Sequence, residues 1–245
     1  MITICIPAFD EASTIGLVLW RVRQVFEANP REYEILVCDD ASTDATADVL
    51  APYARVMPVT VLRHETRRGY AAALDTLLRA AAQRTRYPRR DAAIILQADL
   101  TDPADGIAEL LRPFDGGVDL VVAESSPAPV APVPVRRLRR VAPWLLRALP
   151  RVAGVRDPLG SLRLVRLAVV RDAIKTAGEK PLVGAPGWAA NAELLAALAP
   201  HARRIETVAV QSRYDLRQRD TRVRAWRDAL ELLKFARARR AARPA

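Results

Sequence analysis

The first half of the chain alternates short apolar runs with longer segments of helical periodicity. The apolar runs predict strands at residues 2–6, 34–38, 56–62, 92–96 and 119–123. Between them, helix-forming residues with apolar positions three to four apart predict helices at residues 12–28, 43–54, 69–84 and 103–112. Strands that alternate with helices form mostly parallel sheets covered on both faces. The sequence therefore predicts an α/β fold with a mostly parallel central sheet and helices on both faces.

Acidic residues follow three of the predicted strands. Pairs of acids come after the first, second and fourth strands, and they are Asp10 and Glu11, Asp39 and Asp40, and Asp99 and Asp102. Ligands of such sheets bind beyond the carboxyl ends of the strands. Helix capping accounts for some of these polar residues, but adjacent acids after a buried strand repel each other unless a ligand or cation uses them. We therefore expect one ligand-binding crevice at this edge.

The positive charge lies elsewhere in the chain. Lys and Arg number 38 against 28 Asp and Glu, a net charge of +10. Residues 136–151 carry +6 and residues 213–243 carry +7, so the rest of the chain is mildly acidic at −3. A basic protein suggests a nucleic-acid partner, but these segments lack interleaved aromatic residues and any recognisable motif. We expect no nucleic-acid partner.

Both basic segments have an amphipathic pattern. On a helical wheel the first has an apolar face, made of Leu138, Val141, Ala142, Leu145, Leu146 and Leu149. The opposite face is basic, with Trp144 near it, and comprises Arg136, Arg137, Arg139, Arg140, Arg147 and Arg151. This pattern is typical of a helix lying on an anionic membrane surface, and the alternative is a core-packed helix with a solvated basic face. The second segment spaces Val223, Trp226, Leu230 and Leu233 in the same way.

Two proline effects bear on the first basic segment. Pro143 would kink its helix unless the helix begins there. The proline-rich stretch 125–135 just before it predicts an extended tether and not a helix.

The cellular compartment follows from the cysteines and the apolar runs. Cys5 and Cys38 lie inside apolar runs, which predicts buried thiols of a reduced protein. Asp10 and Glu11 interrupt the first apolar run, so we expect no secretory leader. No run approaches the ~20 apolar residues of a membrane span. With the amphipathic segments, this predicts a cytoplasmic protein, peripheral on the inner face of the membrane.

Four ordered motifs of the first half resemble those of family 2 glycosyltransferases with the GT-A fold. Residues 4–11 (ICIPAFDE) are similar to the opening V-I-P-A-Y-N-E, and residues 37–46 (VCDDASTDAT) to V-D-D-G-S-T-D-G-T. Residues 68–73 (RGYAAA) resemble the G-x-G-A-A step, and residues 97–103 (QADLTDP) the metal motif D-A-D-L-Q-D-P. This resemblance covers roughly residues 1–125 and implies inverting transfer of a hexose from a GDP-mannose or UDP-glucose type of donor.

The resemblance assigns roles to the donor half. Asp99 is implied as a catalytic residue and, with Gln97, as a ligand of Mg²⁺ or Mn²⁺, although Gln97 replaces the first acid of the metal motif. The residues implied in contact with the nucleotide sugar are Pro7, Ala8, Asp10, Glu11, Asp39, Asp40, Gln97 and Ala98.

The second half resembles the dolichol-phosphate and polyprenyl-phosphate mannose synthase branch of the family. Residues 157–164 (DPLGSLRL) are similar to D-P-x-S-G-F-R-L, which implies that Asp157 orients the acceptor or acts as a base; a turn acid before Pro158 is the alternative. The acceptor is then a polyprenyl phosphate at an anionic membrane surface. Its phosphate needs arginines, and the candidates are Arg136, Arg137, Arg163, Arg213 and Arg217.

The expected organisation is one catalytic domain at 1–212, with a donor half at 1–125 and an acceptor half at 126–212, followed by a basic segment at 213–245. Two alternatives stay open. The chain could be a family 2 transferase with a non-lipid acceptor. Because of Gln97, it could also be a degenerate GT-A domain that only binds.

Overall fold

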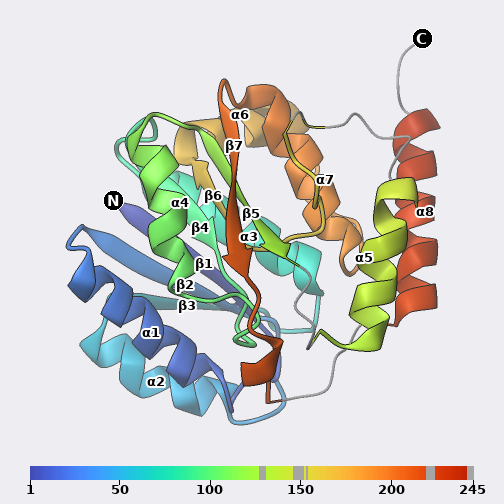
Figure 1. Ribbon diagram of the computed structural model, residues 1–245. Helices are drawn as coiled ribbons and strands as arrows, with labels where there is room; N and C mark the ends of the chain where they lie inside the picture. The colour runs from blue at the N-terminus through green and yellow to red at the C-terminus, as the bar shows by residue number, and fades with distance from the viewer. Residues whose placement is uncertain (127–130, 146–151, 153, 219–223, 242–245) are drawn as a thin grey trace.

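A single sheet organises the molecule. The computed structural model describes residues 1–126, 131–145, 152, 154–218 and 224–241. Their seven strands have the order β3-β2-β1-β4-β6-β5-β7 (Figure 1). The strands are β1 (Ile2–Ala8), β2 (Tyr33–Asp39), β3 (Val59–Arg63), β4 (Ala92–Ile95), β5 (Leu120–Ser126), β6 (Arg163–Arg166) and β7 (Ile205–Gln211). Only β6 runs antiparallel to its neighbours, β4 and β5, which confirms the mostly parallel sheet.

Helices cover both faces of this sheet. One face packs against α1 (Ile15–Ala28), α2 (Thr46–Val56) and α4 (Gly106–Asp115). The other packs against α3 (Tyr70–Arg84), α6 (Leu167–Ala177) and α7 (Ala189–Leu198). Side chains alternate along β1, so Ile4 and Ile6 join the first apolar layer and Cys5 joins the second. Every residue of β1 is buried, as expected for a central strand with helices on both sides.

The predicted elements are confirmed, with shifts at their ends. The four predicted helices begin one to three residues later, because residues before them form the turns that leave the strands. The strand predicted at residues 56–62 starts late for another reason. Val56 is the last residue of α2, and Met57 is extended because it precedes Pro58. β3 therefore begins at Val59.

The prediction of a non-helical tether at 125–135 is wrong at both ends. β5 continues to Ser126, and α5 (Val133–Leu145) begins inside the proline-rich stretch. Pro134 lies in the first turn of α5, where its missing N–H has no helical acceptor to lose. Residues 127–130 are outside the described part of the chain. Pro143 lies within α5, so the helix does not begin there.

The helix α8 (Ala225–Ala241) lies beside α5 (Figure 1). Leu138 and Ala142 of α5 are buried in one cluster with Leu232 and Ala236 of α8 and with residues of α7. Leu138 and Ala142 therefore pack inward, as in the core-packed alternative, whereas Val141 of the same predicted face is exposed. Contact of this segment with a membrane stays a prediction. Leu146, Arg147, Leu149, Arg151 and Val223, which belonged to the same predictions, lie outside the described residues.

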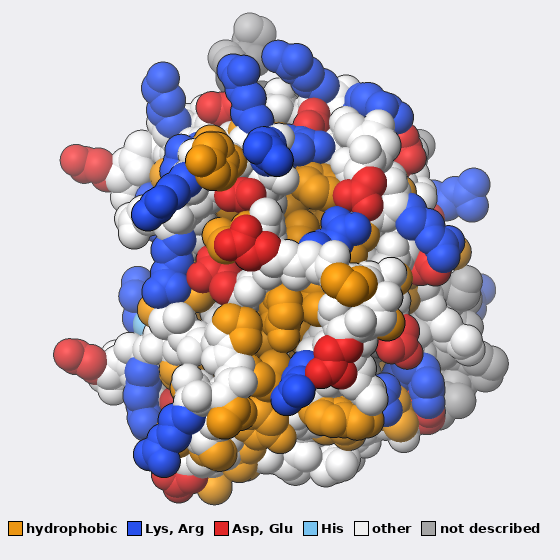
Figure 2. All heavy atoms as spheres, turned by 90° about the vertical axis from the view of Figure 1, so that its left-hand side faces the viewer, with side chains coloured by type: hydrophobic (Ala, Val, Ile, Leu, Met, Phe, Trp, Pro, Cys, Tyr) orange, Lys and Arg blue, Asp and Glu red, His pale blue; other side chains and the backbone are white. Residues whose placement is uncertain are grey.

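The exposed side of this helix pair is basic and apolar, and we call it the α5–α8 outer face. Its exposed apolar residues are Val133, Val141, Trp144, Trp226 and Leu230. Its exposed basic residues are Arg136, Arg137, Arg140, Arg224, Arg227, Lys234 and Arg237. Among the described residues of α5 and α8, no acidic side chain is fully exposed. The opposite side of the molecule is mixed, with acidic and basic side chains around a strip of apolar ones (Figure 2).

Candidate active site

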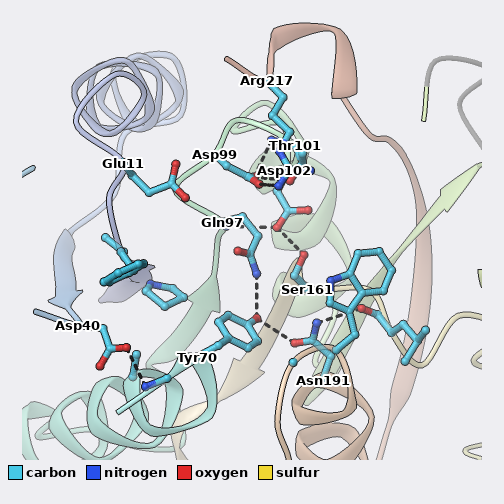
Figure 3. Close-up of a pocket in the computed structure, with 18 of the residues that line it drawn as sticks. Glu11, Asp40, Tyr70, Gln97, Asp99, Thr101, Asp102, Ser161, Asn191 and Arg217 are labelled. Atoms are coloured by element: carbon cyan, nitrogen blue, oxygen red, sulfur yellow. Dashed lines mark hydrogen bonds and ion pairs between the residues drawn. The ribbon is translucent and has the colours of Figure 1, made fainter. Parts of the chain in front are cut away.

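Three loops at the carboxyl ends of β1, β2 and β4 surround a cavity of about 360 Å³ (Figure 3). Each loop contains a non-glycine residue with a left-handed backbone. These residues are Asp10, Ala41 and Leu100, with φ of 50°, 58° and 65°. They are the only such residues in the described part of the chain. Left-handed backbone costs free energy in residues with a Cβ atom, and such strain concentrates at functional sites.

The loop after β1 contributes part of the cavity wall. Pro7, Ala8 and Glu11, which belong to the residues predicted to contact the donor, line the cavity. Asp10 does not line it. Its Oδ1 accepts hydrogen bonds from the backbone N of Thr43, at 2.8 Å, and from the Thr43 hydroxyl. Asp10 therefore holds the first loop to the second.

The paired acids after β2 have different surroundings. Asp40 lines the cavity and accepts hydrogen bonds from the backbone N of Arg68 and of Gly69, at 2.8 and 2.7 Å. Gly69 has φ +92°, a conformation that glycine adopts at little cost and that precedes α3. His64 Nδ1 lies 2.7 Å from Asp40 Oδ1.

Asp39 is fully buried behind this wall. Its Oδ1 accepts a hydrogen bond from the backbone N of Ser42 at 2.9 Å. Its buried Oδ2 has no hydrogen-bond partner among the described residues, and the Nε of Arg63 lies 3.5 Å away. An acceptor oxygen left this way can take a hydrogen bond from a ligand.

The loop after β4 holds Asp99 between two neighbours. Asp99 Oδ1 accepts hydrogen bonds from the backbone N and the hydroxyl of Thr101. Asp99 Oδ2 lies 3.2 Å from Nη2 of Arg217, and both side chains are nearly buried. Arg217 comes from the segment after β7, just beyond the short 3-10 helix η3 (Tyr214–Leu216). Asp99, Gln97 and Arg217 all line the cavity, while Ala98 is buried in the core.

Asp102 connects this loop to the second half of the chain. Its Oδ2 accepts hydrogen bonds from the backbone N of Gln97, at 3.2 Å, and from the hydroxyl of Ser161, at 2.7 Å. Burial raises the pKa of Asp102 to about 6, and the negative charge of Asp99 contributes in the same direction.

A chain of side-chain hydrogen bonds forms the floor of the cavity. Gln97 Nε2 donates to the hydroxyl of Tyr70 at 2.8 Å, and that hydroxyl donates to Asn191 Oδ1 at 2.9 Å (Figure 3). Tyr70 begins α3 and Asn191 lies in the first turn of α7. The floor therefore joins both halves of the protein.

The predicted arginines are mostly not at the cavity. Arg136 and Arg137 are exposed on the α5–α8 outer face. Arg213 is partly exposed and forms an ion pair with Asp215, which raises its pKa. Of the five candidates for acceptor phosphate, Arg217 lines the cavity.

Arg163 has a structural role in this fold, which corrects the predicted contact with phosphate. Its side chain is fully buried, and burial lowers its pKa to about 10. Nη1 donates to the backbone carbonyl of Asn191 and Nη2 to that of Pro158. The guanidinium supports the loop and helix behind the cavity and does not line it.

Arg139 is a cavity residue that was not singled out from the sequence as a phosphate ligand. Its guanidinium lies 5.6 Å from the ring centre of Trp188, and its Nη2 lies 3.6 Å from Asp157 Oδ2. Its buried Nε has no hydrogen-bond partner among the described residues. A helical wheel could have found it, because Arg139 is the arginine of α5 nearest the buried Leu138 face.

Asp157 lies behind the cavity wall. Its Oδ1 accepts a hydrogen bond from the backbone N of Leu159 at 3.0 Å, which is the arrangement of a turn acid. Its Oδ2 pairs with Arg139, and Asp157 itself does not line the cavity. Sequence reasoning also missed Asn191 and Trp188, which carry no motif of their own, while Tyr70 and Ser161 lie inside recognised motifs without an assigned role.

Comparisons with known proteins agree with this architecture. The glycosyl transferase family 2 model matches residues 3–171. A bactoprenol glucosyl transferase of Shigella phage SfX is 29% identical over 184 residues, covering 74% of this chain and 57% of the relative. A dolichol-phosphate mannosyltransferase of Pyrococcus furiosus is 23% identical over 174 residues, covering 69% and 47%. The chain thus spans about half the length of these curated relatives.

Solved structures share the fold. Glucosyl-3-phosphoglycerate synthase from Mycobacterium tuberculosis, crystallised with Mn²⁺, UDP-glucose and phosphoglyceric acid, aligns with a TM-score of 0.68. The alignment covers 100% of this chain and 81% of that one at 18% identity, which establishes the GT-A fold. From its matched residues, the chain belongs to glycosyl transferase family 2.

Proposed function

We propose that this protein transfers a hexose, with inversion, from a nucleotide sugar to the phosphate of a polyprenyl phosphate. The observation that carries the proposal is the cavity itself. Its strand-end loops present Glu11, Asp40 and Asp99, with Arg217 paired to Asp99, and α5 adds Arg139. A cavity that holds carboxylates together with arginines fits a diphosphate donor held through a cation and a phosphate acceptor held by arginine.

The strand-end loops fit the donor. Phe9 lines the cavity with Arg67 stacked on its ring, 3.9 Å from the ring centre, which gives a flat wall suited to a nucleobase. Asp40 stands at the same wall, and Asp39 lies behind it, with its Oδ2 at 3.5 Å from the Nε of Arg63. We assign base and ribose contacts to this group, with Pro7 and Ala8 shaping the wall. Asp10 holds the loop in place. The donor that we propose is a nucleotide sugar of the GDP-mannose or UDP-glucose type.

The oxygen ligands at this site fit a divalent cation whose coordination is completed by phosphate oxygens of the substrate. The described residues contain no group of three or more His, Cys, Asp or Glu side chains placed to hold a metal. Mg²⁺ and Mn²⁺, however, bind through one or two protein ligands together with phosphate oxygens. Asp99, nearly buried and here balanced by the guanidinium of Arg217, is the carboxylate that would hold the ion, with Gln97 as a neutral second ligand. When bound, the ion offsets the negative charge that develops on the leaving diphosphate.

The acceptor side needs arginine more than it needs a base. A phosphate monoester, with a second pKa of about 6, is largely ionised at neutral pH and can attack without losing a proton to the enzyme. Arg139 lines the cavity, and Asp157 and Trp188 hold its guanidinium. We therefore assign Arg139 and Arg217 to the acceptor phosphate and give Asp157 the role of positioning Arg139.

The α5–α8 outer face is the surface we propose to lie on an anionic membrane. Two exposed tryptophans, Trp144 and Trp226, stand among exposed arginines and Lys234. Aromatic residues with surrounding basic side chains favour the interface of an anionic bilayer. In the described part of the chain, no helix has the length and apolarity to span a bilayer. Peripheral attachment through this face at the inner side of the membrane, where free thiols such as Cys5 and Cys38 stay reduced, is the proposal.

The test is a transfer assay with the whole chain. Radiolabelled UDP-glucose and GDP-mannose are each offered with Mn²⁺ and either polyprenyl phosphate or 3-phosphoglycerate, the second because the fold neighbour was crystallised with phosphoglyceric acid. We expect label to enter the organic phase with the lipid acceptor. Transfer only to 3-phosphoglycerate would move the assignment to a non-lipid acceptor. Absence of transfer with every pairing would contradict a catalytic role and leave a nucleotide-binding domain.

A further inference from the structure

The hydrogen-bond chain under the cavity has a fixed direction. It starts at the backbone carbonyl of Leu159, which can only accept a hydrogen bond. Asn191 Nδ2 donates to this carbonyl at 3.0 Å. The other side of the Asn191 amide, Oδ1, therefore faces Tyr70.

The next group in the chain is the hydroxyl of Tyr70, which donates to one neighbour and accepts from the other. A phenol has one hydrogen to give, and Asn191 Oδ1 takes it at 2.9 Å. A phenol has a pKa of about 10, so that hydrogen stays on the hydroxyl at neutral pH. The contact of 2.8 Å with Gln97 must then be donated by Gln97 Nε2, because the hydroxyl offers only a lone pair there.

The consequence falls on Gln97. With Nε2 committed to Tyr70, the carbonyl oxygen Oε1 occupies the other position of the amide, on the cavity side of the floor (Figure 3). We propose that Tyr70 and Asn191 are positioning residues that fix the Gln97 amide with its carbonyl oxygen toward the cation and diphosphate site. This inference rests on the proposed cation-dependent donor binding.

The same chain explains why glutamine, and not an acid, suits position 97 here. A carboxylate offers only acceptor oxygens, so Tyr70 would face two acceptors, residue 97 and Asn191 Oδ1, with one hydrogen. One buried oxygen would lose its hydrogen-bond donor, which destabilises the fold. Arg163 adds to the rigidity, because its Nη1 donates to the backbone carbonyl of Asn191 and anchors the start of α7. Gln97, which replaces the first acid of the family's metal motif, is therefore the residue that this hydrogen-bond chain requires.

The experiment is a double-mutant cycle on nucleotide binding. Affinity for UDP and for GDP is measured calorimetrically on the whole chain, once with Mn²⁺ and once with EDTA, and the ratio of the two affinities is the readout. Tyr70→Phe removes the acceptor for Gln97 Nε2, and Gln97→Met removes the oxygen ligand at similar volume. Tyr53→Phe is the matched control, because Tyr53 packs against the core between α1 and α2, away from the cavity.

We expect Tyr70→Phe and Gln97→Met each to lower the ratio about three- to tenfold, with the affinity in EDTA nearly unchanged. The double variant should lose no more than Gln97→Met alone, since Tyr70 acts through Gln97. The inference would be overturned if the two single-variant losses in the affinity ratio multiplied in the double variant. It would also be overturned if Mn²⁺ had no effect on nucleotide binding by the wild type. The readout of this experiment is nucleotide binding. Its result can therefore be interpreted even if the sugar-transfer assay is negative.

Discussion

The strand-end loops and the arginine-bearing segments line one cavity, and they are built differently. The loops after β1, β2 and β4 carry their acids next to parallel strands whose register is fixed by backbone hydrogen bonds. Position along a strand therefore decides where Asp40 and Asp99 lie. The arginines lie on α5 and after β7, where side-chain packing decides which of them faces inward.

This difference teaches where a charge count misleads. Of the four arginines of α5, three are exposed and Arg139 alone reaches the cavity. Segment 136–140 has the same net charge whichever arginine turns inward. The cavity therefore depends on single positions in both walls, and substitutions at matched pairs of positions compare the two walls directly.

The largest effect is expected at the strand ends. Asp99→Ala removes the one carboxylate placed to hold a cation and leaves Arg217 without its partner. We expect turnover to fall by roughly three orders of magnitude or more, the loss seen when a central electrostatic contact is removed. Asp10→Asn is the control within the same wall, because Asp10 holds a loop and does not line the cavity. Single-turnover transfer of labelled sugar measures both, and near-normal activity of Asp99→Ala would remove Asp99 from the mechanism.

The second effect contrasts two arginines of one helix. Arg139→Ala should lower kcat/KM for the phosphate acceptor about a hundredfold, because an ionised contact to phosphate is lost and Asp157 is left without its cation. Arg137→Ala, two positions earlier and exposed, should leave kcat/KM for a water-soluble short-chain acceptor within about twofold. Initial rates at varied acceptor concentration measure the difference. Equal losses in both variants would mean that α5 contributes only general positive charge.

The strand-end loops could be predicted from the sequence better than the arginine-bearing segments. The strands, the parallel sheet and the strand-end acids were predicted, because apolar periodicity and the carboxyl-end rule depend on local sequence. Arg163 was misassigned because nothing local indicates that a guanidinium will be buried against the carbonyls of Pro158 and Asn191. Asn191 was missed for the same reason, since its role exists only once α7 meets α3. The roles of these residues depend on tertiary contacts, which local patterns in a single sequence do not indicate.

A tenfold effect is expected on the membrane side of the comparison. Trp226→Ala, on the α5–α8 outer face, should weaken binding to anionic phosphatidylglycerol vesicles about tenfold, because burial of one large aromatic side chain in the interface is lost. Trp20→Ala is the matched control, since Trp20 is also an exposed helical tryptophan but lies on α1. Vesicle flotation measures both. Equal weakening in the two variants, or no binding by the wild type, would reject this face as the attachment surface.

The smallest effect tests the junction between the two walls, at Asp102. Its folded pKa, about 6, lies above the ordinary value of 3.8, so the folded state holds the proton more tightly than the unfolded chain. The folded protein therefore loses stability as pH rises from about 4 to about 6, and below this window the loss is absent. A shift of this size corresponds to at most roughly 3 kcal/mol. Because Asp102 lines the cavity and keeps some contact with solvent, we expect about 1 kcal/mol.

Asp102→Asn separates this titration from the hydrogen bonds. Both the Gln97 backbone N and the Ser161 hydroxyl donate to the same oxygen, Oδ2, which an asparagine carbonyl can replace. Relative to wild type, the variant should gain about 1 kcal/mol in its free energy of unfolding between pH 4 and pH 7, measured by urea titration without added cation. A difference that does not change with pH would mean that Asp102 is ionised as readily in the folded protein as in the unfolded one. The wall of acids would then carry its full charge without a cation, and only the direct ion pair with Arg217 would balance Asp99.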